Sequence, residues 1–262
     1  MNMENSPRRT RIKKGIYVLP NLFTSASLFC GFYSMIASYK ENFVTAAIAI
    51  LVSVIFDGLD GRVARLTNTT SKFGAEYDSL ADVISFGVAP AFMAYCWSLS
   101  IYGKLGWIVA FLFVLCGALR LARYNIQIGI IESKVFNGLP IPAAASVVAL
   151  TVIFFDYFGV EEKIYNNFIL VLVFILSFLM VSSVKYYSFK DMTLLKRKPF
   201  TIFFWLIVLL IIIVHWPEVM LFVIMLGYAI SGPVWWIIKL IDKMMNRKKT
   251  GLDAKETNNK LE

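Results

Sequence analysis

The stretch from Asp57 to Asp82 reads DGLDGRVARLTNTTSKFGAEYDSLAD. It carries four aspartates, and it joins two apolar runs at about 43–62 and 76–98. Placing a charged side chain among apolar ones is costly, so acidic residues within membrane segments generally mark a functional site. The stretch therefore predicts two neighbouring helices with a polar site between them.

The rest of the chain is too apolar for a soluble protein. It has 262 residues, of which 58% are hydrophobic and 16% are charged, against about 45–50% apolar residues in soluble domains. Its mean hydropathy is +0.69. Each of its apolar runs is long enough, or nearly so, to cross a bilayer as a helix. They lie at about 17–38, 43–62, 76–98, 106–126, 141–160, 166–184, 200–215 and 217–240. These observations predict an all-α integral membrane protein with about eight transmembrane helices.

The basic residues predict how these helices are oriented. If the amino terminus is cytosolic, all of the 26 Lys and Arg residues except Lys40, Lys104 and Lys163 fall on the cytosolic side. This distribution satisfies the positive-inside rule. We therefore expect both termini and the aspartate stretch to be cytosolic. The polar segment after about Asn246 lacks apolar periodicity, and we expect it to have no regular structure.

The four aspartates are spaced to meet. Asp57 and Asp60 are three residues apart at the end of one run, and Asp78 and Asp82 are four apart at the start of the next, so each pair shares a helix face. Antiparallel neighbours joined by a short loop bring both pairs to one depth. Four close carboxylates repel one another and gather protons or hard cations such as Mg²⁺, Mn²⁺ or Ca²⁺. With one His and three scattered Cys, a zinc finger and a CxxC redox pair are excluded.

This stretch matches the pattern D-x-x-D-G-x-x-A-R-x8-G-x3-D-x3-D at every position and so resembles the CDP-alcohol phosphotransferase family. Pro20-Asn21-Leu22-x-Thr24 in the first run is placed as in family members. The resemblance implies a six-helix membrane core, a homodimer, and transfer of a phosphatidyl group from CDP-diacylglycerol to an alcohol with release of CMP.

The resemblance also implies roles for individual residues. Asp57, Asp60, Asp78 and Asp82 would hold one or two divalent cations, Mg²⁺ or Mn²⁺, and Asp82 would also deprotonate the attacking hydroxyl. The CDP-lipid would contact Asn21, Thr24, Asp60, Gly61, Arg65 and Gly74. The chemistry agrees, because divalent metals neutralise the charge that develops on a pyrophosphate during phosphoryl transfer.

Three later segments, 82–91, 120–125 and 136–144, resemble family members whose acceptor is L-serine. Arg120 and Arg123 lie three residues apart at the cytosolic end of the fourth run. Guanidinium groups are natural partners for the serine carboxylate, and the amide oxygen of Asn125 could hold its ammonium. The alternative interpretation is that both arginines are membrane anchors that contact lipid phosphate.

The predicted organisation is then as follows: 1–16 a basic cytosolic arm, 17–185 the catalytic six-helix membrane core, 186–240 two additional membrane helices in a hairpin, and 241–262 a polar cytosolic tail. We expect a bacterial or archaeal cell membrane and no nucleic-acid partner. Two other functions remain open at this point. One is a transferase of the same family with another acceptor, such as glycerol phosphate or inositol phosphate. The other is a divalent-cation transporter that uses the aspartates for permeation.

Overall fold

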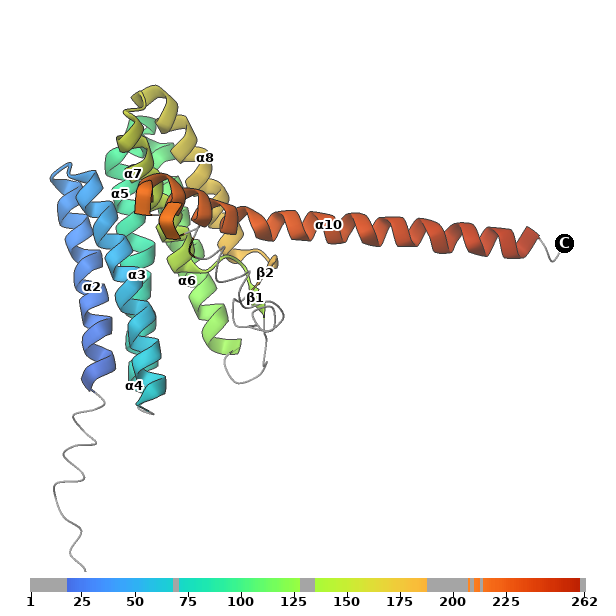
Figure 1. Cartoon of the computed structure of the whole chain (residues 1–262), viewed down its shortest axis with the longest axis horizontal. Coiled ribbons are helices and arrows are strands. Elements are labelled where there is room, and N and C mark those ends of the chain that lie inside the picture. Colours follow the sequence, from blue (N-terminus) through green and yellow to red (C-terminus); the bar gives the residue numbers. More distant parts are fainter. Residues whose placement is uncertain are drawn as a thin grey trace, which may run out of the picture.

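The computed structural model of the chain describes residues 18–67, 71–127, 135–187, 207, 210–212 and 214–259. Figure 1 shows a bundle of helices and one longer helix that runs across it. In chain order the elements are α2 (Val18–Tyr39), α3 (Phe43–Leu66), α4 (Lys72–Asp82), the π-helical η1 (Val83–Val88), α5 (Ala89–Trp97), the 3₁₀ turn η2 (Leu99–Tyr102), α6 (Lys104–Gln127), β1 (Val135–Asn137), α7 (Ile141–Phe158), α8 (Glu162–Val181), β2 (Lys185–Tyr187) and α10 (Pro217–Asn259).

The predicted membrane fold is confirmed. Within the described ranges, seven helical segments are long and apolar enough to cross a membrane, and they match seven of the eight predicted runs. The remaining run, 200–215, lies largely outside the described residues. The sequence did not indicate β1 and β2, which have three residues each and pair antiparallel with Phe136 opposite Tyr186.

Small residues let α2 approach α3 and η1 closely. A Cβ atom on Gly31 would lie 2.7 Å from the Cα of Ser85, so a larger residue does not fit there. The hydroxyls of Ser27 and Ser53 are 2.8 Å apart, and Ser85 Oγ donates to the Ser27 carbonyl over 3.2 Å. Such contacts are typical of helix pairs in membranes. They hold the segment that directly follows Asp82 against α2.

The centre of the bundle is α7. Its residues from Ala143 to Val152 are all buried, and it packs against α3, α8 and α10. The chain enters α7 through Gly138, which has a positive φ of 80°. A Cβ atom there would lie 2.3 Å from the Met180 carbonyl oxygen, so both the backbone conformation and the space require glycine.

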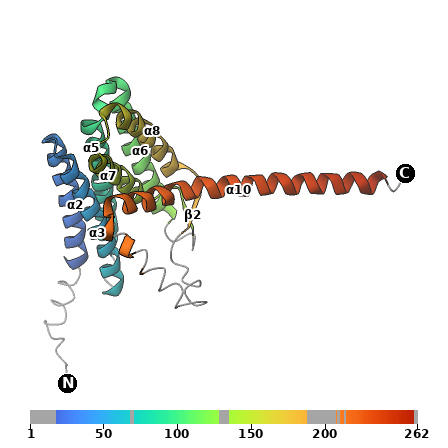
Figure 2. The same cartoon turned by 45° about the horizontal axis from the view of Figure 1, so that its top comes forward.

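The long helix α10 runs crosswise to the bundle in both Figure 1 and Figure 2. Its main contacts are with α7 and β2. Tyr186 of β2 is fully buried against it and donates a hydrogen bond to the Ala229 carbonyl over 2.9 Å. This burial raises the pKa of the Tyr186 phenol. Gly232 leaves the room that the tyrosine ring occupies, since a Cβ there would lie 2.4 Å from it.

The C-terminal part of the chain is more helical than its sequence predicts. The first arm of the predicted hairpin lies largely outside the described residues, and the second arm forms the first half of α10. The expectation that the segment after about Asn246 has no regular structure is wrong, because α10 continues to Asn259. The segment contains Lys, Arg, Ala, Leu and Glu, which are strong helix formers even without an apolar face to bury.

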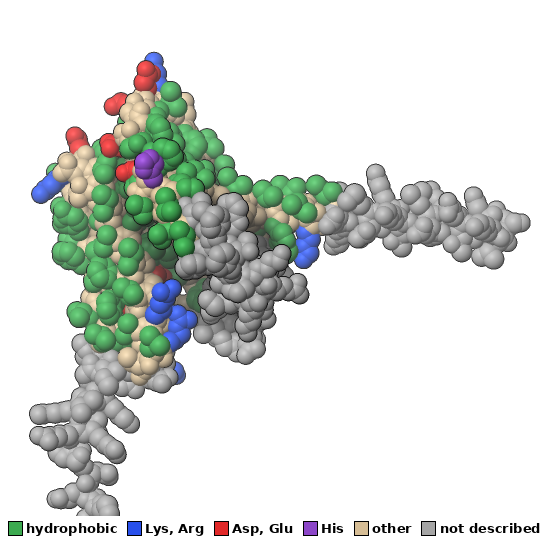
Figure 3. Space-filling view, viewed as in Figure 1, with side chains coloured by type: hydrophobic (Ala, Val, Ile, Leu, Met, Phe, Trp, Pro, Cys, Tyr) green, Lys and Arg blue, Asp and Glu red, His purple; other side chains and the backbone are tan. Residues whose placement is uncertain are grey.

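The surface of the bundle suits lipid along its sides and water at its ends. Figure 3 shows apolar side chains over the sides of the helices, and acidic and a few basic ones gathered where the α2–α3 and α7–α8 turns lie. Large apolar side chains such as Leu22, Phe29 and Ile55 are more than 60% exposed. Below, the "far end" denotes these two turns, 40–42 and 159–161, and the "carboxylate end" denotes the opposite end, with the four aspartates.

Candidate active site

The aspartates of α3 and α4 converge at the carboxylate end. Carboxylate oxygens of Asp57, Asp60 and Asp78 all lie within 4.8 Å of one another. The turn between the helices helps to set this geometry, because Ser71 caps α4 by accepting a hydrogen bond from the Gly74 amide over 2.9 Å. The side-chain spacing of the sequence therefore does produce a cluster of hard oxygen ligands.

Asp82 lies at the edge of this cluster. Its carboxyl is within hydrogen-bonding reach of Asp57, although it is not part of the group within 4.8 Å. It is the last residue of α4, directly before the π-helical segment η1. Single π-helical turns are frequent at functional sites because they shift the register of the side chains around them.

The cluster fits a divalent cation. Asp78 Oδ1 is buried and has no hydrogen-bond partner among the described residues. A buried carboxylate oxygen without a partner is costly unless a cation or a proton neutralises it. Carboxylate-only sites suit Mg²⁺ and Mn²⁺ better than softer metals. Asp57, Asp60 and Asp78, with Asp82 beside them, are the residues able to hold such an ion.

A cavity of about 130 Å³ adjoins the aspartates. Five of the six residues expected to contact the CDP-lipid line it: Asn21, Thr24, Asp60, Gly61 and Gly74. Asp60 is 6% exposed and accepts a 2.8 Å hydrogen bond from the Thr24 hydroxyl. The sixth residue, Arg65, is exposed, and its Nε donates to the Gly61 carbonyl over 2.8 Å.

Two glycines keep this cavity open. A Cβ on Gly61 would have the Arg65 guanidinium as its nearest neighbour, 4.0 Å away, so the position faces open space. A Cβ on Gly74 would lie 3.1 Å from Ser71 Oγ and 3.3 Å from Asn21 Oδ1. Any side chain at position 74 would thus press on the polar atoms of the cavity wall.

Sequence reasoning missed three residues of this region. Ser71 and Ala75 line the cavity, and the Tyr77 hydroxyl lies 2.8 Å from Ser25 Oγ, joining α4 to α2. A signal for Ser71 was available, since a serine before an expected helix start is a typical N-cap. Nothing local to Tyr77 indicates its partner 52 residues away.

The three residues expected to contact serine have different surroundings. Arg123 is exposed, and its Nη1 donates to the Val181 carbonyl at the end of α8 over 2.9 Å. Asn125 uses its amide nitrogen to donate to Ser79 Oγ on α4 over 2.8 Å. Its amide oxygen has no hydrogen-bond donor within the described ranges. Only Asn125 and Arg120 therefore approach the helix that carries Asp78 and Asp82.

Arg120 is the buried member of the three. It is 7% exposed, and its Nε has no hydrogen-bond partner within the described part of the chain. It is close enough to Asp82, Tyr124 and Tyr228 for electrostatic interaction. Tyr228 belongs to α10, so the helix that follows the six-helix region reaches the surroundings of the aspartates. The sequence did not indicate this contact.

Comparisons with known proteins agree with the family resemblance of the aspartate stretch. The family model described as CDP-alcohol phosphatidyltransferase matches residues 17–179. A CDP-diacylglycerol–serine O-phosphatidyltransferase of Helicobacter pylori is 41% identical over 239 residues, covering 90% of this chain and 98% of the relative. A protein of the same name from Methanocaldococcus jannaschii is 43% identical over 155 residues, or 55% of this chain and 69% of the relative. An archaetidylserine synthase of Methanothermobacter thermautotrophicus is 40% identical over 170 residues, or 64% and 69%.

Proposed function

This chain belongs to the CDP-alcohol phosphatidyltransferase family, and we propose that it transfers the phosphatidyl group of CDP-diacylglycerol to the hydroxyl of L-serine, forming phosphatidylserine and CMP. The names of its relatives support serine as the acceptor. The observation that carries the proposal is the cluster of Asp57, Asp60 and Asp78 at the wall of a cavity lined by the residues expected to contact the CDP-lipid.

In the proposed reaction the serine hydroxyl attacks the phosphorus that bears the diacylglycerol. The new bond joins the serine oxygen to this phosphorus, and the bond to the bridging oxygen of the pyrophosphate breaks. The hydroxyl proton passes to Asp82, and CMP leaves with the bridging oxygen. Asp82 suits this duty because it lies at the edge of the carboxylate cluster, next to Asp57 and near Arg120. A positioned general base contributes about a hundred- to ten-thousand-fold to such a rate.

The family depends on divalent metals, and we propose Mg²⁺ or Mn²⁺ held by Asp57, Asp60, Asp78 and Asp82. When bound, such an ion neutralises the charge that develops on the phosphates of the donor. The protein's own residues position the donor. Thr24 fixes the Asp60 carboxylate at the cavity wall through a 2.8 Å hydrogen bond. Asn21 and the Gly61 and Gly74 backbones leave room for the nucleotide. Arg65, at the exposed rim, is placed to meet a phosphate.

We assign recognition of the serine carboxylate to Arg120 and of its ammonium to Asn125. Arg120 is buried with an unpartnered Nε close to Asp82, and a buried guanidinium donor gains most from a carboxylate partner. The amide oxygen of Asn125 has no hydrogen-bond donor among the described residues, while its amide nitrogen donates to Ser79. We do not assign the carboxylate to Arg123, because its Nη1 already donates to the carbonyl of Val181 at the end of α8.

Further proposals concern the surroundings of the enzyme. We place the carboxylate end and both termini on the cytosolic side of a bacterial or archaeal cell membrane, as the distribution of basic residues supports. We also propose a homodimer, and a division into a basic arm (1–16), a catalytic core (17–185), two additional helices (186–240) and a polar tail (241–262). The electrostatic interaction of Tyr228 with Arg120 supports a role for α10 in the acceptor site.

The test is a product assay with the purified protein, CDP-diacylglycerol, a divalent cation and labelled alcohols. We expect serine to give a labelled phospholipid together with CMP. Labelled product from glycerol phosphate or inositol phosphate instead would reassign the acceptor within the family. Cation flux into vesicles without any lipid product would favour the transporter and contradict the proposal.

A further inference from the structure

A second cavity, of about 380 Å³, lies at the far end of the bundle. It is formed by the α2–α3 turn, the start of α3, the end of α5, the last turns of α7 and the start of α8. The donor and acceptor residues described above all lie at the carboxylate end, so the proposed reaction does not use this cavity. We infer that it binds the headgroup of a phospholipid that carries a primary ammonium, from the membrane leaflet opposite the aspartates.

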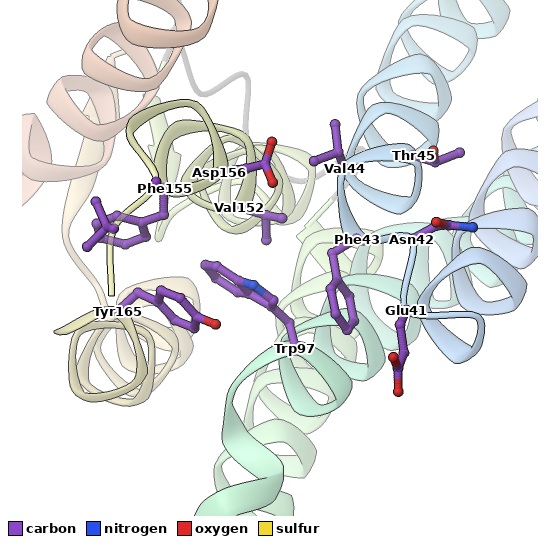
Figure 4. A pocket seen from close by; sticks show the side chains of 12 residues that line it. Glu41, Asn42, Phe43, Val44, Thr45, Trp97, Val152, Phe155, Asp156 and Tyr165 are labelled. Atoms are coloured by element: carbon purple, nitrogen blue, oxygen red, sulfur yellow. The ribbon is translucent and has the colours of Figure 1, made fainter. Parts of the chain in front are cut away.

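Aromatic rings form one wall of this far-end cavity. The rings of Trp97 and Tyr165 are stacked, with centroids 4.6 Å apart and an angle of 12° between their planes. Phe155 lies 6.3 Å from Trp97 and 6.1 Å from Tyr165. Figure 4 shows Trp97 between the rings of Tyr165 and Phe43. The faces of such rings attract cations, and Trp and Tyr are favoured at the depth of lipid headgroups.

A carboxylate adjoins the aromatic wall. Asp156 of α7 lines the cavity, and in Figure 4 its carboxylate extends from α7 toward α3, on the side of Trp97. Glu41 belongs to the rim, with its carboxylate directed away from Trp97 in the same view. The described lining contains neither Lys nor Arg. Because a carboxylate accepts hydrogen bonds, it favours a primary ammonium over a quaternary one, which has no N–H group to donate.

The same cavity also offers a place for a phosphate. Phe43, Val44 and Thr45 form the first turn of α3 and line the cavity. The N-cap residue Asn42 makes no side-chain hydrogen bond to this turn. The free amides and the positive end of the helix dipole at such a terminus favour an anion. An ammonium beside Asp156 and a phosphate at the start of α3 match the two charges of a zwitterionic headgroup.

Exposed apolar side chains next to the cavity indicate a lipid rather than a soluble amine. Ile48 is one turn further along α3 than Val44 and is 50% exposed. Tyr157 and Phe158 of α7, next to Asp156, are 52% and 54% exposed. Ile48 lies deeper in the bundle than the cavity and would contact the acyl chains of a lipid whose headgroup occupies it, while Tyr157 and Phe158, at the end of α7, would border the headgroup. A small soluble amine would make no use of these side chains.

The test measures which lipids the purified protein retains. Protein in nanodiscs of equal parts dioleoyl phosphatidylethanolamine and dioleoyl phosphatidylglycerol is released into the gas phase, and bound lipids are identified by native mass spectrometry. We expect phosphatidylethanolamine to be retained preferentially, and Asp156→Asn to reduce that preference about three- to five-fold, because the Asp156 carboxylate is exposed and an exposed ion pair contributes little. Glu162→Gln is the matched control, because Glu162 lies at the same end but does not line the cavity.

Other results would overturn the inference. One is equal retention of phosphatidylethanolamine by the wild type and Asp156→Asn, and another is an equal loss in Glu162→Gln. If free ethanolamine binds in an Asp156-dependent way while no lipid preference exists, the ligand is a soluble amine and the lipid assignment fails. CMP release serves as the check on folding, because Asp156 is remote from the aspartates and its substitution should leave turnover unchanged. If the wild-type protein transfers no phosphatidyl group to serine but still retains phosphatidylethanolamine through Asp156, the proposed function fails and the inference about the far-end cavity stands.

Discussion

The two halves of the candidate active site are built differently. The donor half consists of a single cavity lined by Asn21, Thr24, Asp60, Gly61 and Gly74, and hydrogen bonds join α2 to α3 and to α4 beside it. The three residues assigned to the acceptor half have separate surroundings in the described part of the chain. Arg120 is buried near Asp82, Arg123 is bound to the end of α8, and Asn125 is bound to α4.

This difference follows from where the residues lie in the sequence. The donor half comes from residues 20–24 and 57–82, on helices that are consecutive in the chain and antiparallel. The acceptor half joins α6 to elements that are distant in sequence, including Val181 of α8 and Tyr228 of α10. We therefore expect substitutions in the donor half and at the aspartates to abolish turnover. Those in the acceptor half should change the response to serine and differ from one residue to the next.

The largest effect should come from removing the metal. If Asp57, Asp60 and Asp78 hold a catalytic cation, exhaustive chelation should reduce CMP release by about a thousand-fold or more, because a metal ion contributes several kcal/mol to stabilising phosphoryl transfer. Added Mg²⁺ or Mn²⁺ should restore it. The assay is CMP release with both substrates in excess, and full activity in the chelated protein would contradict the role of the cluster.

The second effect concerns Asp82. Asp82→Asn preserves the size of the side chain but removes its ability to accept a proton, so turnover should fall about a hundred- to ten-thousand-fold. Binding of CDP-diacylglycerol should change little, since Asp82 does not line the donor cavity. Glu76→Gln, an exposed change on the same helix, is the matched control. A loss of only a few-fold in Asp82→Asn would mean that another group is the base.

The clustering of the aspartates could be predicted from the sequence because it depends on helix periodicity. Two antiparallel helices joined by a short turn bring Asp57, Asp60 and Asp78 to one depth, and the structure places their oxygens within 4.8 Å of one another. The roles of Asn21 and Thr24 came from resemblance, and the 2.8 Å bond from Thr24 to Asp60 supplies a physical reason for the threonine. Local spacing was sufficient here because each partner is one helix away in the chain.

Other features could not be predicted because they depend on long-range packing. The partner of Arg123 lies 58 residues further along the chain, and α10 has a crosswise direction that no hydropathy pattern encodes. The far-end cavity combines residues from four helices and the adjoining turns, none of which shows a motif. The helical C-terminal segment was missed for a different reason. Apolar periodicity signals helices that pack, whereas this segment forms a helix from residues with high intrinsic propensity.

The third effect distinguishes the acceptor half from the donor half. Arg120→Ala removes a buried guanidinium whose Nε has no partner in the described residues. If this group binds the serine carboxylate, the KM for serine should rise about ten- to a hundred-fold, as for loss of a charge-assisted contact. The KM for CDP-diacylglycerol should stay nearly constant. Equal increases for both substrates would instead identify Arg120 as a residue that stabilises the whole site.

The smallest effect should come from Arg123, which lies one helical turn from Arg120 and so provides its natural comparison. Its Nη1 is already used by the Val181 carbonyl, in an exposed contact that ties α6 to the end of α8. Arg123→Ala should therefore lower the free energy of unfolding by about 1 kcal/mol, the usual value of one such hydrogen bond, while the KM for serine changes less than about three-fold. Thermal unfolding in detergent and serine titration measure the two quantities on the same preparation. The contrary outcome is an increase in the serine KM as large as that of Arg120→Ala, without loss of stability. It would show that Arg123 leaves the Val181 carbonyl to bind the substrate, and that both arginines bind the serine carboxylate.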